Sequence, residues 1–233
     1  MSTTALSCGN VGGAARPSGD VVQWHDVPAA PGRHDLDPLL AEATDRVVVR
    51  GTDGDLAAVV LRLLRKELLT RLTVGYVPVA DSPVARLWGL EVGDVERALA
   101  APPRPVPLLK DDSGGILLGE GVLEPITGQA YCDDERVLNG PATRVVVSPD
   151  PEAEALLDPT SDPLNHTIEP PMDGLRVTVT RRGLLRRREH VARGRAFQAS
   201  FRTTTVRHDG TDHPRAVAKW VWYRHTEDLN LAR

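Results

Sequence analysis

The chain has 233 residues, which is enough for one large domain or two smaller ones. Its hydrophobic fraction of 41% is ordinary for a soluble globular protein, and no stretch reaches the roughly 18 to 20 apolar residues that a membrane-spanning helix needs. The net charge of −4 hides an asymmetry, because the segment from Gly174 onward contains 14 basic and 5 acidic residues. This positive segment favours an anionic partner.

The N-terminal region and the cysteines predict a cytoplasmic protein. Cys8 and Cys132 lie far apart in the sequence and form no metal-binding or redox spacing, so we expect reduced thiols. The N-terminus lacks the basic start and apolar core of a secretory signal peptide. Residues 1–20 are small and glycine-rich, and we expect them to be mobile.

A strand at residues 21–25 and a helix at 36–44, which Asp35 caps, precede the central unit. This unit begins with residues 46–50, an apolar β-branched run typical of a buried strand.

The turn over residues 51–55 reads Gly-Thr-Asp-Gly-Asp, and it leads into an apolar helical pattern over 56–69 with Asp55 at the N-cap. A second strand follows at 72–78, so the pattern predicts a right-handed βαβ unit. The two glycines of the turn can adopt positive φ and bring the backbone close to a ligand. A glycine turn at a helix start suits phosphate, although it also serves simply as a tight connection.

Two segments of this unit resemble motifs of the diacylglycerol kinase, sphingosine kinase and NAD kinase superfamily. The turn is similar to the family's Gly-Gly-Asp-Gly-Thr motif, with matches at Asp53 and Gly54. Residues 78–90 resemble the lipid kinases' Pro-Leu-Gly-Thr-Gly-Asn-Asp-Phe-Ala-Arg segment, with matches at Pro78, Ala85, Arg86, Gly89 and Leu90. The resemblance implies ATP and Mg²⁺ as cofactors and Asp53 as the catalytic motif acid. The residues that it implies for nucleotide binding are Gly51, Thr52, Gly54, Asp55, Ala80, Asp81 and Ser82.

The sequence departs from both motifs. Thr52 replaces a glycine, Asp55 replaces the threonine, and residues 80–83 are shorter than the family's Gly-Thr-Gly-Asn-Asp core. Asp55 would place a carboxylate beside the triphosphate, where like charges repel unless a metal ion intervenes. We also find no counterpart of the lipid kinases' first strand and helix, so we expect an N-terminally shortened domain.

The second half of the chain predicts a β-sandwich. A helix at residues 95–101 ends at the proline-rich segment 102–107, which we interpret as a stiff connector between domains. Beyond it the sequence changes to short β-prone runs separated by turn signals. The expected strands are at residues 115–118, 121–123, 129–132, 143–147, 175–180, 197–201 and 216–223. Residues 149–171 are expected to be a loop with a helical turn near 153–157.

This order is similar to that of the lipid kinases, in which an α/β domain precedes a β-sandwich and the C-terminus returns to the first domain. The implied domains are a nucleotide-binding-like α/β domain with a parallel sheet at 1–102, a β-sandwich at 103–225 and a returning segment at 226–233. Residues 171–177 resemble the family's Asp-Asp-Gly-Leu-Leu-Asp-Val segment. Residues 206–211 resemble a segment ending Asp-Gly-Glu, which makes Asp209 the candidate active-site acid of the sandwich.

The remaining charged residues are less specific. The stretch from Arg181 to Arg195 is rich in arginine, and it contacts an anionic membrane surface, contacts nucleic-acid phosphates or is a solvated hairpin. Few aromatic residues are interleaved, which makes nucleic acid an unlikely partner. His208 and His213 superficially suggest a metal site, but a turn at Asp209-Gly210 explains the pattern better, and we expect no metal ligands beyond the Mg²⁺ of a nucleotide.

Two functions follow from the sequence. The first is an ATP-dependent lipid kinase that transfers a phosphoryl group to a lipid hydroxyl, which would bind a nucleotide and a lipid. The second is a catalytically inactive protein of the same fold with a binding or regulatory role, which the altered motifs favour.

Overall fold

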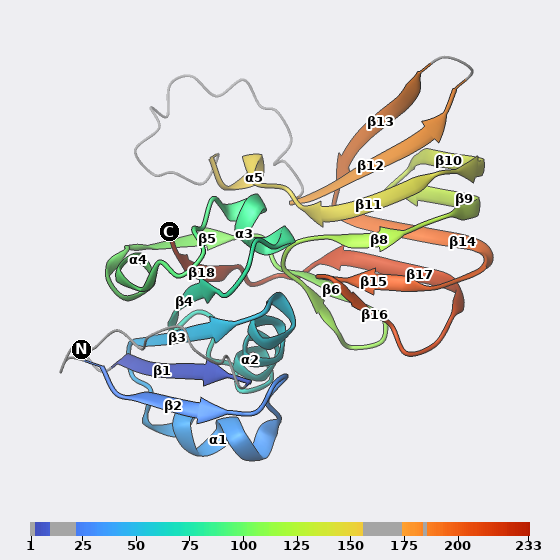
Figure 1. Ribbon diagram of the computed structural model, residues 1–233. Helices are drawn as coiled ribbons and strands as arrows, with labels where there is room; N and C mark the ends of the chain where they lie inside the picture. Colours follow the sequence, from blue (N-terminus) through green and yellow to red (C-terminus); the bar gives the residue numbers. More distant parts are fainter. Residues whose placement is uncertain (1–2, 10–21, 156–173, 184–185) are drawn as a thin grey trace. The chain divides into compact units, whose positions relative to one another are not determined.

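The computed structural model describes residues 3–9, 22–155, 174–183 and 186–233 (Figure 1). The chain divides into two compact units. Unit 1 comprises Met1–Pro105 and Glu227–Arg233, and unit 2 comprises Val106–Thr226.

Unit 1 is built on a six-stranded sheet with the strand order β2-β1-β3-β4-β18-β5. Its strands are β1 (Thr3–Cys8), β2 (Trp24–Val27), β3 (Arg46–Gly51), β4 (Thr73–Pro78), β5 (Pro103–Val106) and β18 (Leu229–Ala232). The neighbouring strands from β2 to β18 pair in parallel. The C-terminal strand β18 thus extends the sheet of the N-terminal half beside β4.

Four helices accompany this sheet, namely α1 (Arg33–Glu42), α2 (Asp53–Arg65), α3 (Pro83–Trp88) and α4 (Val95–Ala100). Helix α2 buries Leu56, Val59, Val60 and Leu63, whose spacing forms one apolar face. Helix α4 packs closely on β4 because Gly75 has no side chain: a Cβ there would lie 2.2 Å from the carbonyl oxygen of Ala98. No helix in the described residues is long and apolar enough to span a membrane.

Two segments of unit 1 contain strands that the sequence analysis did not predict. Residues 3–8 are not mobile but form β1, which lies between β2 and β3 and is buried at every position from Thr4 to Cys8, on both faces of the sheet. The domain therefore does begin with a strand, contrary to our expectation that the first strand is missing. Residues 10–21, which follow it, lie outside the described residues. The proline-rich segment is partly a strand, because Pro103 and Pro105 lie in β5 at the sheet edge, where a strand tolerates prolines; the division between the two units falls within this segment, after Pro105.

Unit 2 is a sandwich of two six-stranded sheets. One has the order β10-β9-β14-β17-β6-β7 and the other the order β13-β12-β11-β8-β15-β16. The strand pairings of the described residues in both sheets are antiparallel, and one apolar cluster that includes Phe197 and Trp222 lies between the sheets. The strands of the first sheet are β6 (Leu109–Asp111), β7 (Ile116–Leu117), β9 (Ile126–Cys132), β10 (Glu135–Ala142), β14 (Ala196–Thr204) and β17 (Val217–Arg224). Those of the second are β8 (Gly121–Leu123), β11 (Arg144–Pro149), β12 (Leu175–Arg182), β13 (Arg187–Gly194), β15 (Val206–His208) and β16 (Thr211–Asp212).

The predicted fold class, an α/β domain with a parallel sheet and a β-sandwich, is confirmed. The short helix α5 (Glu152–Ala155) occupies the start of the segment predicted as a loop, and the rest of that segment, residues 156–171, lies outside the described residues. The segment that resembles the family's Asp-Asp-Gly motif is described only from Gly174 onward, where β12 begins at the next residue.

Candidate functional site

The buried carboxylate of Asp53 links the two motif segments of unit 1. Asp53 is the first residue of α2 and is only 4% exposed. Its Oδ1 accepts hydrogen bonds from the hydroxyls of Tyr76 (2.8 Å) and Ser82 (2.6 Å), and its Oδ2 accepts one from the backbone N–H of Val84 (3.0 Å). Tyr76 belongs to β4, whereas Ser82 and Val84 begin α3. One side chain therefore joins a strand and two helix starts.

Asp55 is also buried, and it stabilises the turn. Its Oδ2 accepts hydrogen bonds from the backbone N–H and the hydroxyl of Thr52 (both 2.8 Å), and its Oδ1 accepts one from the backbone N–H of Ala30 (2.7 Å). The Thr52 hydroxyl accepts a hydrogen bond from the Asp55 N–H at 3.3 Å, which completes a capping box. The N-cap is thus Thr52, and the prediction that Asp55 caps the helix is wrong, because Asp55 occupies the N3 position.

Neither glycine of the turn has unusual backbone geometry, and Gly51 is needed for space. Gly51 ends β3 and Gly54 lies in the first turn of α2, and neither has positive φ. The expectation that these glycines adopt positive φ is therefore wrong. Gly51 is required because a Cβ at this position would lie 2.6 Å from Oδ2 of Asp55. The close approach that we expected for a ligand is made by the chain's own carboxylate.

The second motif forms the start of helix α3. The Ser82 hydroxyl accepts a hydrogen bond from the backbone N–H of Ala85 (3.2 Å), so Ser82 is the N-cap. Ala80 and Asp81 are exposed in the loop before it, and Asp81 pairs with Arg86 at 2.6 Å. Among these three residues, the structure brings only Ser82 into contact with Asp53.

The start of α2 carries two carboxylates at the place where the resemblance implies a triphosphate. A helix start attracts anions through its unpaired N–H groups and its dipole. Asp53 and Asp55 already place two carboxylates there, and the backbone N–H of Thr52 donates to one of them. An added phosphate would meet these charges unless a cation intervened. The described residues contain no group of three or more His, Cys, Asp or Glu side chains that could hold a metal ion.

Tyr76 is the residue of this site that the sequence did not single out. Its hydroxyl donates to Asp53 and lies 3.2 Å from the carbonyl oxygen of Gly51. Burial, followed by the negative charge of Asp53, raises the pKa of Tyr76 well above its usual range, so the hydroxyl remains a proton donor. The available signal was a hydroxyl-bearing residue at a buried position of an apolar strand.

In unit 2, the carboxylate of Asp209 holds a loop of the sandwich. It accepts hydrogen bonds from the backbone N–H groups of Leu118 (2.9 Å), Gly119 (2.7 Å) and Glu120 (2.9 Å). Asp209 and Gly210 both have positive φ, 43° and 80°, and they form the two-residue turn between β15 and β16. The predicted Asp-Gly turn is therefore confirmed, and its acid is buried among backbone amides.

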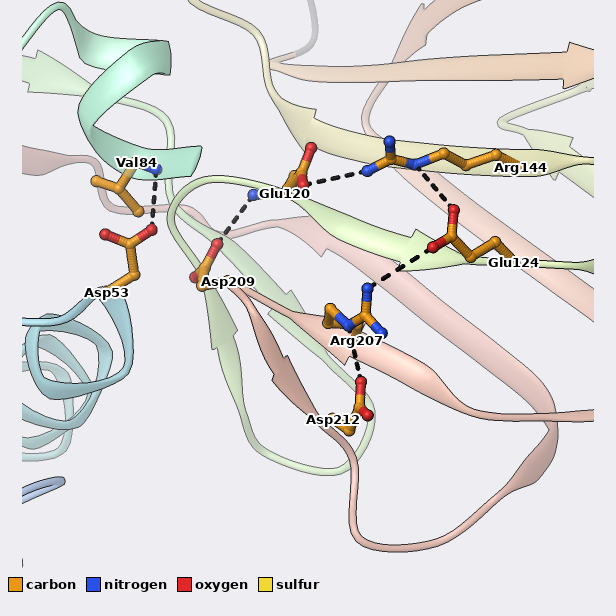
Figure 2. A network of polar contacts seen from close by, with 8 residues as sticks. All are labelled: Asp53, Val84, Glu120, Glu124, Arg144, Arg207, Asp209 and Asp212. Atoms are coloured by element: carbon orange, nitrogen blue, oxygen red, sulfur yellow. Dashed lines mark hydrogen bonds and ion pairs between the residues drawn. The ribbon is translucent and has the colours of Figure 1, made fainter. Parts of the chain in front are cut away.

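A chain of charged contacts continues from this loop (Figure 2). Arg144 lies between Glu120 (3.2 Å) and Glu124 (3.4 Å), and Arg207 lies between Glu124 (3.7 Å) and Asp212 (2.8 Å). These side chains are partly exposed, so each pair adds little stability by itself. Together they tie the neighbouring strands β11, β8, β15 and β16.

The histidines of this region form an aromatic cluster. His208 packs against Trp220 and Trp222, with ring centroids 5.2 Å and 5.3 Å away, and His213 packs edge-on against Trp220 at 5.0 Å. Nε2 of His208 lies 3.8 Å from Oδ2 of Asp111, which is too long for a hydrogen bond. Burial lowers the pKa of His208, and Asp111 partly opposes this shift.

Comparisons with known proteins identify the fold. No protein-family model matches the sequence, and no curated protein matches it. A diacylglycerol kinase from Bacillus anthracis strain Sterne has a similar structure, with a TM-score of 0.65 over 99% of this chain and 96% of that chain at 10% identity. An NAD kinase from Archaeoglobus fulgidus in complex with ATP has a TM-score of 0.54 over 100% of this chain and 94% of that chain at 12% identity. The chain therefore has the fold of the diacylglycerol kinase and NAD kinase superfamily, as the sequence resemblance predicted.

Proposed function

We propose that this chain is a kinase-fold protein with a binding or regulatory role and no phosphoryl-transfer activity. The observation that carries this proposal is the use of Asp53 at the expected catalytic position. Both of its carboxylate oxygens accept hydrogen bonds from Tyr76, Ser82 and Val84. A kinase needs a carboxylate at the attacking hydroxyl or on a metal ion, whereas this carboxylate is committed to joining β4, α2 and α3.

The charge at the start of α2 supports the same conclusion. The family motif has a neutral threonine where this chain has Asp55, so the substitution adds a negative charge at this position. It also takes the backbone N–H of Thr52, a group that a phosphate would otherwise use. In this proposal unit 1 is the degenerate nucleotide-binding-like domain expected at residues 1–102, with its returning segment expected at 226–233, and unit 2 is the β-sandwich expected at 103–225; the units themselves divide after Pro105 and after Thr226.

A second candidate is an ATP- and Mg²⁺-dependent lipid kinase. It is favoured by the contact between Asp53 and Ser82, because this contact brings together the two segments that resemble the kinase motifs. Asp53 would act as the motif acid and Asp209 as an assisting acid. Gly51, Thr52, Gly54, Asp55, Ala80, Asp81 and Ser82 would lie at the nucleotide. Mg²⁺ would supply charge neutralisation for the phosphates when bound.

Calorimetric titration with ATP and magnesium separates the two functions. Our proposal predicts no binding heat at millimolar nucleotide and no transfer of labelled phosphate to a panel of lipids with free hydroxyls. Micromolar ATP binding together with transfer that Asp53→Asn abolishes would establish the kinase instead. The exposed Asp112→Asn is the matched control, because it makes the same chemical change away from both motifs.

A further inference from the structure

The free end of the β12–β13 hairpin concentrates positive charge. The register places Arg181 opposite Arg188 and Arg182 opposite Arg187. Pairing of β12 with β11 ends at Thr180, so beyond this residue β12 pairs only with β13. Figure 1 shows the hairpin extending past β11 at this end.

This arrangement opposes folding unless something neutralises it. Like charges directly opposite each other destabilise a strand pair, and a two-stranded ribbon is marginal by itself. Among the described residues, Arg182, Arg186, Arg187 and Arg188 have no ion pair, and Arg181 donates only to the carbonyl oxygen of Val137.

Another arginine of the same hairpin has a structural role and provides a comparison. Arg193, further along β13, pairs with the buried Asp150 at 2.8 Å and with Glu152 at 2.7 Å. The four arginines at the free end have no comparable acidic partners among the described residues. Glu189 is the one acidic residue of β13. The contrast indicates that these four arginines serve a partner rather than the fold.

The shape of this arginine end, defined by Arg182, Arg186, Arg187 and Arg188, suits an extended anionic surface. Successive residues of a strand point to opposite faces, so Arg187 and Arg188 present positive charge on both sides of the ribbon. Val191, two positions beyond Glu189 on the face of Arg187, is 40% exposed and adds an apolar contact. A projecting end of this kind reaches many phosphates without enclosing a single one.

We infer that the arginine end docks on the phosphate head groups of an anionic lipid bilayer. A bilayer contacts only the projecting end. A long nucleic acid would also lie close to the rest of the chain, whose net charge of −4 repels its phosphates. This inference is independent of whether the chain transfers phosphate.

Vesicle co-sedimentation tests the inference with the full chain. Wild type should bind vesicles of phosphatidylcholine and phosphatidylglycerol in equal parts, release them as salt rises, and ignore pure phosphatidylcholine. Arg182→Gln/Arg187→Gln/Arg188→Gln should weaken binding about a hundredfold. The control Arg136→Gln/Arg202→Gln/Arg215→Gln removes the same charge from other exposed positions of unit 2 and should retain most of the binding.

The inference is wrong if the variant of the arginine end binds anionic vesicles as tightly as wild type. It is also wrong if wild type binds both vesicle types equally, or if the arginine-end variant and the control variant lose the same affinity. Tighter binding to duplex DNA than to anionic vesicles at the same salt would assign the surface to nucleic acid instead. A circular dichroism melt of each variant confirms folding, and replacing the opposed arginines should not lower the melting temperature.

Discussion

Oη of Tyr76 and Oδ1 of Asp53 lie 2.8 Å apart in the interior of unit 1. This contact fixes the first turn of α2 against β4, and Ser82 and Val84 extend it to α3. A buried carboxylate that loses a donor keeps the desolvation cost and forfeits the hydrogen bond. Removing one of these donors by substitution therefore measures how much its hydrogen bond contributes to the stability of unit 1.

Tyr76→Phe should lower the free energy of unfolding by about 1 to 3 kcal/mol, because it removes one of the three hydrogen bonds to the buried Asp53 carboxylate. Urea denaturation monitored by circular dichroism measures this change. Tyr131→Phe, at a half-buried position of unit 2, is the control and should cost less. Equal stability of Tyr76→Phe and wild type would show that the hydroxyl contributes nothing to the fold.

Gly51→Ala tests whether the turn glycine provides space. The added Cβ would lie 2.6 Å from Oδ2 and 2.9 Å from Cβ of Asp55, and both atoms belong to the capping box. Overpacking at such a site costs about 1 to 3 kcal/mol. Gly32→Ala is the matched control, because its Cβ would meet nothing closer than 3.6 Å. A neutral effect at Gly51 would mean that the turn can move aside.

The sequence predicted the helices and strands of unit 1 better than it predicted the roles of their polar side chains. The β-branched strand, the helix over α2 and the second strand follow from periodicity, and the motif order pointed to the fold. The roles of Asp53 and Asp55 could not be predicted, because their partners Tyr76 and Ala30 lie more than twenty residues away and are brought close only by the tertiary fold.

Two other errors have local causes. Strand β1 was missed because its sequence, Thr-Thr-Ala-Leu-Ser-Cys, carries small and polar residues, and its burial comes from neighbours on both sides. Strand β5 was missed because prolines normally end regular structure, yet an edge position needs fewer N–H donors. Both strands depend on pairing partners that local sequence does not reveal.

Asp209→Asn should destabilise unit 2 by about 1.5 to 3 kcal/mol, because a carboxylate that accepts three backbone N–H groups becomes an amide with one acceptor oxygen. Asparagine tolerates the positive φ of this position, so the substitution isolates the effect of charge and hydrogen bonding. Hydrogen exchange should show faster exchange at the amides of Leu118, Gly119 and Glu120. Unchanged protection of these amides would refute the anchoring role.

His208 predicts a pH dependence of stability. Burial, with a smaller contribution from His213, lowers its pKa below the ordinary value of 6.5, so the unfolded chain binds this proton more tightly than the folded chain. The stability that neutral His208 contributes is present above that ordinary value and is lost as the pH falls below it. The melting temperature should drop between about pH 7 and about pH 5, and the drop should be smaller in His208→Gln. The exposed His34→Gln should behave like wild type, and an equal drop in all three proteins would exclude His208 as the cause.

The double substitution Thr52→Gly/Asp55→Thr tests the proposed loss of phosphate binding. It recreates the Gly-Gly-Asp-Gly-Thr pattern that the turn resembles and removes one buried carboxylate together with the N-cap hydroxyl. Loss of the capping box should cost about 0.5 to 2 kcal/mol, so the variant should melt earlier than wild type. It should nevertheless bind ATP with magnesium more tightly, because the backbone N–H of Thr52 no longer donates to an internal carboxylate and the like charge is gone. Calorimetry compares both proteins, with Asp81→Ala as the control that removes an exposed charge from the neighbouring loop. If the double variant melts earlier yet gains no more affinity than this control, Asp55 is a helix cap whose charge has no bearing on nucleotide binding.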